Sequence, residues 1–430
     1  MKNFIYILFG LLLGCSSLRD VNYHIYVEDG STEKAYTLED LWNHKRNNKR
    51  INLNKVKGIE IDIEKFMYNR LTEKEFQVLK ECHAVEYIRL IYPNGHLEND
   101  YSIELKEAFS GMKDLKEISM KLDSADHIPN LFPEKNKLQN ITIEGNFIKE
   151  VSVNFSQKSL ENLVVNCSTN RFGFSGKDYS ELRSLRLNIN GKIKELEFSS
   201  LKELELLSLI TKGKIKELDF SGLNELKRLI LITKGKMEEP DVSGLKKLEF
   251  FSFHNDEVEY LSNDFFELPN LQTLILKVPK LKMINENISN LSLLKSLVFT
   301  SYEITELPES LSNLEHLRQF SINTIGRIIS LKPLTTVPKL ERLYISGFNL
   351  IEIVDEVLLM KKLKFLEFTL RQLVNQDLSP LGPLGKLKEI RFKTIYVERD
   401  GDNYIRKDLS DSTINEVLDQ LKKVLPEHFK

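Results

Sequence analysis

Eight histidines are the side chains in this 430-residue sequence best suited to binding a metal or moving a proton. They are scattered without the spacing of a metal site, and the sequence contains neither a His-Glu-x-x-His motif nor a glycine-rich phosphate loop. His254 lies near Asp256, but one histidine with one carboxylate is a weak site, and we interpret the two as a solvated pair. The stretch Asp400-Gly-Asp402-Asn403 lacks further ligands of a calcium loop and is interpreted as a turn. The sequence therefore offers no catalytic residue, no metal ligand and no cofactor site.

The three cysteines, Cys15, Cys82 and Cys167, are too few for a disulfide scaffold or a multi-cysteine zinc site. We expect Cys82 and Cys167 to be buried thiols that do not bridge, because they belong to different segments of the repeat described below.

Cys15 follows a stretch typical of a secretory signal, with a lysine near the start, an apolar run over Phe4–Leu13 and small residues behind it. The run is too short to span a bilayer, which takes about 20 apolar residues. Leu12-Leu13-Gly14-Cys15 resembles the lipobox of bacterial lipoproteins. The resemblance implies cleavage before Cys15, acylation of this residue and a membrane anchor, and Ser16 after it favours the outer membrane. The alternative is an ordinary cleaved signal with an incidental cysteine.

The composition excludes several classes of protein. Hydrophobic residues make up 41% of the chain, which is enough for an extended core and argues against disorder. Lys and Arg number 61 against 63 Asp and Glu, so the net charge of -2 provides no global field for nucleic acid.

A repeat supplies the elements that must position any functional surface. The pattern Leu-x-x-Leu-x-Leu, with other apolar residues as substitutes, recurs at steps of 22 to 24 residues, and we number each repeat from its first leucine. Two degenerate repeats begin upstream at Val56 and Val85. The thirteen clear repeats begin at Leu115, Leu138, Leu160, Leu182, Leu204, Leu226, Leu248, Leu271, Leu294, Leu317, Leu340, Leu363 and Leu387.

This spacing resembles the leucine-rich-repeat family over roughly residues 51–398. The resemblance implies an α/β fold, a right-handed solenoid or horseshoe with a parallel sheet on its concave side and short extended or 3-10 segments on its convex side. The apolar residues at positions 1, 4 and 6 should point inward. The asparagine that the family often carries at position 9 occurs only at Asn146 and Asn190, so we expect most turns after the strands to use other donors. Gly191, Gly213 and Gly235 share one register, and we expect positive φ there.

The ends of a solenoid need caps. We predict a signal peptide over residues 1–14, the lipidated cysteine, a tether and an N-terminal cap over 15–55, the solenoid over 56–398 and a C-terminal cap over 399–430. The C-terminal cap should contain a hairpin around Asp400-Gly401 and an amphipathic helix that begins with a capping box at Thr413. The alternative for this helix is a partner-binding role.

Within the strand of each repeat, the side chains at repeat positions 3, 5 and 7 should lie on the concave face. In the central repeats several of them are apolar, and we interpret them, with nearby cationic and aromatic residues, as a ligand-binding strip. Four apolar members, Leu206, Ile230, Phe250 and Ile275, should stand in one row. The alternative is that β-branched residues merely favour strands. The predicted binding residues are Leu206, Ile210, Arg228, Ile230, Ile232, Phe250, His254, Ile275, Lys277, Val298 and Tyr344.

The sequence thus predicts a non-catalytic envelope lipoprotein that binds a protein or surface ligand through its concave face. A role in adhesion or host interaction is implied only by resemblance to bacterial leucine-rich-repeat surface proteins. Two alternatives are a periplasm-facing scaffold for other envelope proteins and an enzyme acting on envelope glycans. We expect a monomer that contacts the membrane through Cys15, binds no nucleic acid and carries no cofactor.

Overall fold

The structure, a computed structural model of the chain, describes most residues from 56 onward. The described residues are 36–37, 53, 56–62, 73–92, 99–128, 131, 137–153, 158–169, 171–174, 179–191, 193–198, 200–212, 215–235, 237, 239–325, 330–347, 350–400 and 403–428. The expected signal peptide, the anchor at Cys15 and nearly all of the N-terminal cap lie outside them. Among the residues described, no helix has the length and hydropathy needed to cross a bilayer.

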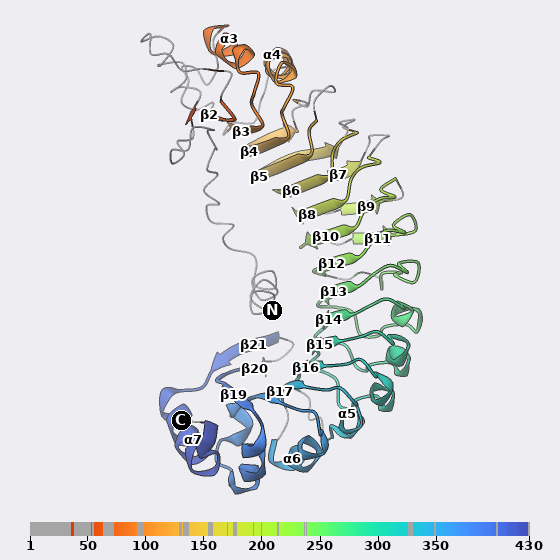
Figure 1. The fold of residues 1–430 in the computed structure, drawn as a ribbon, viewed down its shortest axis with the longest axis vertical. Coiled ribbons are helices and arrows are strands. Elements are labelled where there is room, and N and C mark those ends of the chain that lie inside the picture. The colour runs from red at the N-terminus through yellow and green to blue at the C-terminus, as the bar shows by residue number, and fades with distance from the viewer. Residues whose placement is uncertain are drawn as a thin grey trace. The chain divides into compact units, whose positions relative to one another are not determined.

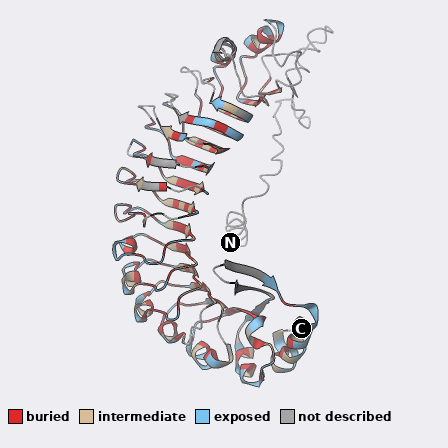
Figure 2. Cartoon of the chain, turned by 180° about the vertical axis from the view of Figure 1, so that it is seen from behind, coloured by how far each residue is buried: buried red, intermediate tan, exposed pale blue. Residues whose placement is uncertain are grey.

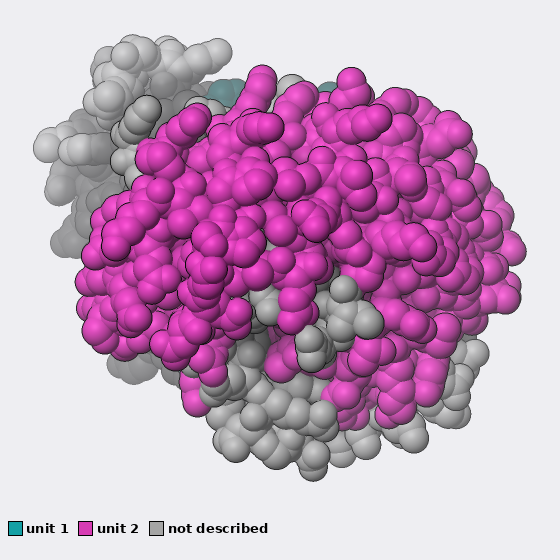
Figure 3. All heavy atoms as spheres, turned by 90° about the horizontal axis from the view of Figure 1, so that it is seen from below, with its two compact units in different colours: residues 1–124, 129–144 teal, residues 125–128, 145–430 magenta. Residues whose placement is uncertain are grey.

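The chain divides into two compact units, which we describe separately (Figure 3). Unit 1 comprises residues 1–124 and 129–144, and unit 2 comprises residues 125–128 and 145–430.

Both units are built from the repeat, and each repeat contributes a strand because its apolar positions 4 and 6 alternate with more polar ones. Neighbouring strands pair in parallel with a register of one whole repeat, so Leu207 lies opposite Leu229, and Leu229 lies opposite Phe251. Together the strands form a seventeen-stranded sheet (Figure 1). Its strands are β1 (Tyr36–Thr37), β2 (Gly58–Asp62), β3 (Tyr87–Tyr92), β4 (Glu117–His127), β5 (Asn140–Val153), β6 (Asn162–Ser168), β7 (Arg171–Phe174), β8 (Ser184–Asn190), β10 (Leu206–Thr211), β12 (Arg228–Thr233), β13 (Phe250–Asn255), β14 (Thr273–Lys277), β15 (Ser296–Thr300), β16 (Gln319–Asn323), β17 (Arg342–Ser346), β18 (Phe365–Thr369) and β19 (Glu389–Lys393).

In unit 1 the longer steps between repeats are filled by helices. Helix α3 (Glu73–Glu81) lies between β2 and β3, and α4 (Asn99–Ser110) lies between β3 and β4. Several of their apolar residues, among them Phe76 and Phe109, are fully or almost fully buried, whereas Ile103 of α4 is 55% exposed.

In unit 2 the segments opposite the strands depend on repeat length. The 22-residue repeats carry extended segments, of which β9 (Ile193–Glu197) and β11 (Ile215–Asp219) pair in parallel. The 23-residue repeats carry the 3-10 helices η4 (Asp264–Phe266), η5 (Glu286–Asn290) and η6 (Glu309–Asn313), and later ones carry α5 (Lys332–Thr335), α6 (Leu350–Leu359), η7 (Leu370–Leu373) and η8 (Ser379–Lys386). The prediction of mostly extended or 3-10 outer segments is confirmed in these repeats, except that α5 and α6 are α-helices.

Figure 2 shows that buried residues occur both on the strands and on these outer segments, and the core lies between the two. The leucines at positions 1 and 4, such as Leu226 and Leu229, are completely buried. Phe251 and Phe253 of β13 pack on Phe265 of η4, with ring centroids 5.3 and 5.9 Å apart respectively. Each fully buried side chain of this size contributes about 1.5–3 kcal/mol, which a single repeat could not gain alone.

A row of buried polar residues lies at position 8 of the repeats, one residue before position 9, where the family often carries asparagine. These residues are among the other donors that the sequence led us to expect. Asn255 donates to the Thr233 hydroxyl at 2.9 Å and to the carbonyl of Gly235 at 3.1 Å. Its carbonyl oxygen accepts from the backbone N–H groups of Glu257 and Val258, at 2.8 and 2.9 Å. The buried residues of this row are Thr211, Thr233, Asn255, Ser301 and Thr324.

The glycines of the shared register play two different roles. Gly235 has φ 93°, as expected, whereas Gly213 lies outside the described residues. Gly191 does not have positive φ. It is needed for close approach, because a Cβ there would lie 1.7 Å from the carbonyl oxygen of Thr169.

The C-terminal end of unit 2 has the predicted hairpin and helix. Strands β20 (Ile395–Asp400) and β21 (Asn403–Asp408) pair antiparallel, followed by α7 (Asp411–Val424) and η9 (Pro426–His428). The expected capping box at Thr413 is wrong, because the N-cap is Ser410, whose hydroxyl accepts from the N–H of Thr413. Helix α7 contacts η8 and buries Val417, Leu421 and the following Leu425.

Candidate binding surface

The predicted binding residues occupy neighbouring strands of unit 2 in three parallel rows. At position 3, Leu206 lies opposite Arg228 and Arg228 opposite Phe250. At position 5, Ile230 is followed by Ser252, Ile275 and Val298. At position 7, the neighbours in order are Ile210, Ile232, His254 and Lys277. The structure therefore brings together ten of the eleven residues, and Tyr344 lies two strands beyond Val298 at position 5.

One expectation about this surface is wrong: Leu206, Ile230, Phe250 and Ile275 do not form a single row. Leu206 and Phe250 stand at position 3, whereas Ile230 and Ile275 stand at position 5, because the register pairs equal positions of successive repeats. The two rows are about 7 Å apart along the strands.

A second correction concerns exposure. Ile275 is only 1% exposed, so it is buried despite its position on the strand face. A side chain in the middle row has neighbours in the rows on both sides and on both adjacent strands, which can cover it completely. The other apolar members are partly exposed, namely Leu206, Ile210, Ile230, Ile232, Phe250 and Val298. We call these six residues the apolar strip.

Two cations, Arg228 and Lys277, lie among the residues of the apolar strip. The Arg228 guanidinium lies over the Phe250 ring, 4.6 Å from its centroid, which fixes the cation above an apolar group. Lys277 is partly buried, and burial lowers the pKa of its ammonium group.

His254 and Asp256 form the pair expected from the sequence, with Nε2 and Oδ1 3.1 Å apart. The hydrogen bond from His254 is the main cause that lowers the pKa of Asp256. Burial, with a smaller contribution from the charge of Asp256, raises the pKa of Tyr302 nearby.

Tyr344 belongs to a second aromatic group beyond the apolar strip. Its ring packs on Phe365 with centroids 4.9 Å apart, and Arg391 lies over the other ring at 5.2 Å. Burial raises the pKa of the Tyr344 hydroxyl. Tyr344 therefore does not extend the apolar strip directly.

A row of ion pairs at position 2, where the chain enters each strand, was missed by the sequence reasoning. Glu205 lies between Arg183 and Lys227, at 3.3 and 3.0 Å. Glu86 is held between Lys57 and Lys116 in unit 1, at 2.8 and 2.6 Å, and Glu341 between Arg318 and Lys364 in unit 2, at 3.7 and 3.1 Å. The cations lower the pKa of each glutamate, chiefly through Lys116, Lys227 and Lys364. Opposite charges at steps of one repeat were the signal in the sequence.

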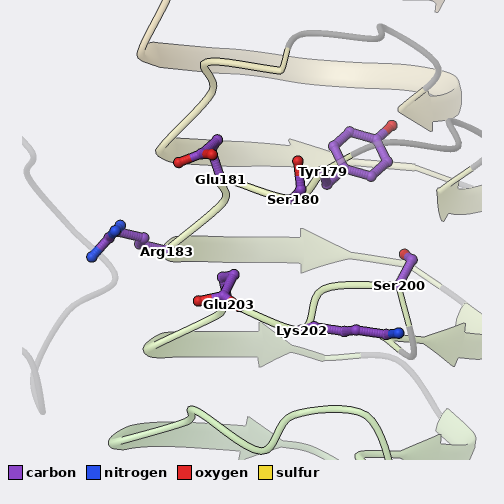
Figure 4. A pocket seen from close by; sticks show the side chains of 7 residues that line it. All are labelled: Tyr179, Ser180, Glu181, Arg183, Ser200, Lys202 and Glu203. Atoms are coloured by element: carbon purple, nitrogen blue, oxygen red, sulfur yellow. The ribbon is translucent and has the colours of Figure 1, made fainter.

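One hollow of 520 Å³ opens beside the start of β8 (Figure 4). Its walls include Glu181, Arg183, Lys202 and Glu203, which carry both signs of charge. None of the predicted binding residues lines this hollow.

The described residues contain no group of three or more His, Cys, Asp or Glu that could hold a metal ion. Cys82 and Cys167 are buried free thiols, as predicted, and burial raises the pKa of Cys167 to about 12. A thiol with so high a pKa is a poor nucleophile at neutral pH.

Comparison with known proteins agrees with the repeat geometry. The sequence matches no protein-family model and none of the curated proteins. Among solved structures, a leucine-rich-repeat protein of Leptospira interrogans is similar over 92% of this chain and 99% of its own, with 16% identity and a TM-score of 0.50. The fold is that of a leucine-rich-repeat solenoid. An internalin of Listeria monocytogenes is also similar, over 76% of this chain and 91% of its own, with 14% identity and a TM-score of 0.49.

Proposed function

We propose that this solenoid is a non-catalytic binding protein of the bacterial envelope, anchored through Cys15, that engages a protein or surface ligand with the strand face of unit 2. The observation that carries the proposal is the apolar strip, because six partly exposed apolar side chains lie on four strands, β10, β12, β13 and β15, within a run of five neighbouring strands. Covering apolar surface yields about 25 cal/mol per Å², and such a strip gains from a partner.

The geometry of the strip supports a protein or another large ligand rather than a small molecule. Its residues lie on a regular sheet face, whereas small-molecule sites are enclosed pockets. The partly buried Phe250 and the Arg228 above it are residue types that dominate protein interfaces.

Envelope anchoring rests on the sequence of residues 1–16. A surface role in adhesion or host interaction and a periplasm-facing scaffold differ in which side of the outer membrane the solenoid faces. Protease treatment of intact cells distinguishes them, because only a surface-exposed chain is cut.

Binding by the strip is tested by truncating its centre. Ile230→Ala combined with Phe250→Ala should weaken partner binding by about 2 kcal/mol or more if these side chains are hot spots. A matched control is Met283→Ala with Leu293→Ala, which removes exposed apolar groups (50% and 40% exposed) away from the strand face. Partners captured by the full-length protein would be quantified for wild type and both variants. Equal capture by all three would contradict the proposal.

A further inference from the structure

The strand face of unit 2 is unbalanced in charge although the whole chain is nearly neutral. Over β6 to β19, positions 3, 5 and 7 carry two carboxylates, and both are neutralised on the same face: Glu367 by Lys393 at 2.6 Å and Glu389 by Arg391 at 2.7 Å. Four further cations have no carboxylate within ion-pair distance in the described part of the chain. These are Arg186, Arg228, Lys277 and Arg342, which we call the unpaired cations.

The burial of Lys277 makes the imbalance costly. Its strand neighbours are His254 and Thr300, neither of which supplies a negative charge. Its pKa is lowered by burial alone, with no carboxylate acting in the opposite direction. A partly desolvated ammonium without a counter-charge is unfavourable, and an anion placed against it would recover part of that free energy.

The unpaired cations alternate with the apolar strip. Arg228 lies between Leu206 and Phe250 at position 3, and Lys277 follows Ile232 and His254 at position 7. Resting on the proposed function, we infer that the strand face of unit 2 binds an acidic protein surface, in which Asp and Glu side chains meet the unpaired cations and apolar side chains meet the strip.

The same face fits nucleic acid poorly. From Arg186 on β8 to Arg342 on β17 there are seven strand spacings, or about 34 Å, which four cations cover sparsely. A single strand of nucleic acid has a phosphate at least every 7 Å or so and is usually held by closely spaced cations and exposed aromatic platforms. Here Phe250 is already covered by Arg228, and Phe365 is only 8% exposed.

The inference is tested with the full-length protein in detergent and three short fluorescent peptides that repeat Glu-Leu-Ser, Lys-Leu-Ser or Gln-Leu-Ser. We expect the Glu peptide to bind at least about tenfold tighter than the Lys peptide at about 50 mM salt, with a smaller difference at about 500 mM. A single-stranded oligothymidylate of equal charge should bind more weakly than the Glu peptide.

Charge reversal locates the effect. Arg228→Glu with Lys277→Glu should invert the preference toward the Lys peptide, a result that mere unfolding would not produce. The matched control is Lys361→Glu with Lys362→Glu, which makes the same change in net charge at two exposed residues outside the strands and should keep the preference of the wild type.

The inference is overturned if wild type binds none of the peptides, if all three bind equally, if the oligonucleotide binds tighter, or if the strand-face reversal and the control behave alike. The outcomes separate it from the proposed function. If all three peptides bind equally and the double variant Ile230→Ala with Phe250→Ala weakens this binding, the proposed function stands and the acidic partner is ruled out. Peptide binding that responds to no change on the strand face would remove both.

Discussion

Asn255 stabilises the solenoid only while its amide makes all of its hydrogen bonds. It is completely buried and links two repeats, donating to the turn behind it and accepting from the turn in front. Asn255→Ala would leave two backbone N–H groups and one carbonyl without their partner, and we expect a loss of about 2–4 kcal/mol. Chemical denaturation measures this loss in the free energy of unfolding. Asn323→Ala, on the partly exposed strand face, is the matched control and should change stability by about 0.5 kcal/mol or less.

Gly191 is constrained by distance rather than by backbone angle. A methyl group there would meet the carbonyl oxygen of Thr169 at 1.7 Å, so Gly191→Ala should lower the thermal midpoint clearly, with a loss above about 2 kcal/mol. Gly244 has no atom within 4 Å of its would-be Cβ, and Gly244→Ala should be neutral or stabilise by up to about 1 kcal/mol. Equal effects of the two substitutions would contradict this account.

Which residues are buried could be predicted from the sequence at some positions of the repeat and not at others. Positions 1, 4 and 6 were predictable because apolar periodicity directly reports the buried face. The row at position 8 was missed because asparagine was sought at the family's position 9, and because Thr and Ser can fill the same role. Ile275 was misjudged because alternation tells which face a side chain points to, but not how far its neighbours cover it.

Within a single strand, truncation on the core side should cost more stability than truncation on the strand face. Leu229→Ala on β12 opens a cavity in the core and should cost about 2–5 kcal/mol, whereas Ile230→Ala beside it should cost about 1 kcal/mol or less. Ile275→Ala should resemble Leu229→Ala, because its side chain is buried. Urea midpoints of the three variants check the assignment, and a larger loss for Ile230→Ala than for Leu229→Ala would contradict the register.

Where the strands begin, the row of ion pairs should make stability depend on pH. Glu86, Glu205 and Glu341 have pKa values below the ordinary 4.5 in the folded state. The unfolded chain then binds more protons, so their contribution is complete above about pH 5 and is lost as the pH falls through the folded pKa values. Each partly exposed pair is worth less than about 1 kcal/mol. The urea midpoint of unfolding should therefore decrease as the pH is lowered below 4.5, and it should decrease less steeply with pH in Glu205→Gln. An unchanged dependence of the midpoint on pH in that variant would count against the role of Glu205.

For the molecule as a whole, the anchor decides where the strand face can act. Cys15→Ala removes the thiol that acylation requires, so we expect the protein to leave the membrane fraction and appear in soluble fractions. Cell fractionation with immunodetection measures this, and Ser16→Ala serves as the control that should stay with membranes. A Cys15→Ala protein that partitions like wild type would show that the lipobox interpretation is wrong.

The side-chain hydrogen bonds and ion pairs between repeats join residues one step apart, such as Asn255 to Thr233 and Lys227 to Glu205. These contacts of a repeat are therefore made with its immediate neighbours. A duplicated segment of 22 or 23 residues could therefore be spliced between two neighbours, where it would inherit the contacts of the seam that it opened. The length of such a protein is then an adjustable quantity: its reach from an attachment point can grow in increments of about 5 Å while every existing contact elsewhere is preserved.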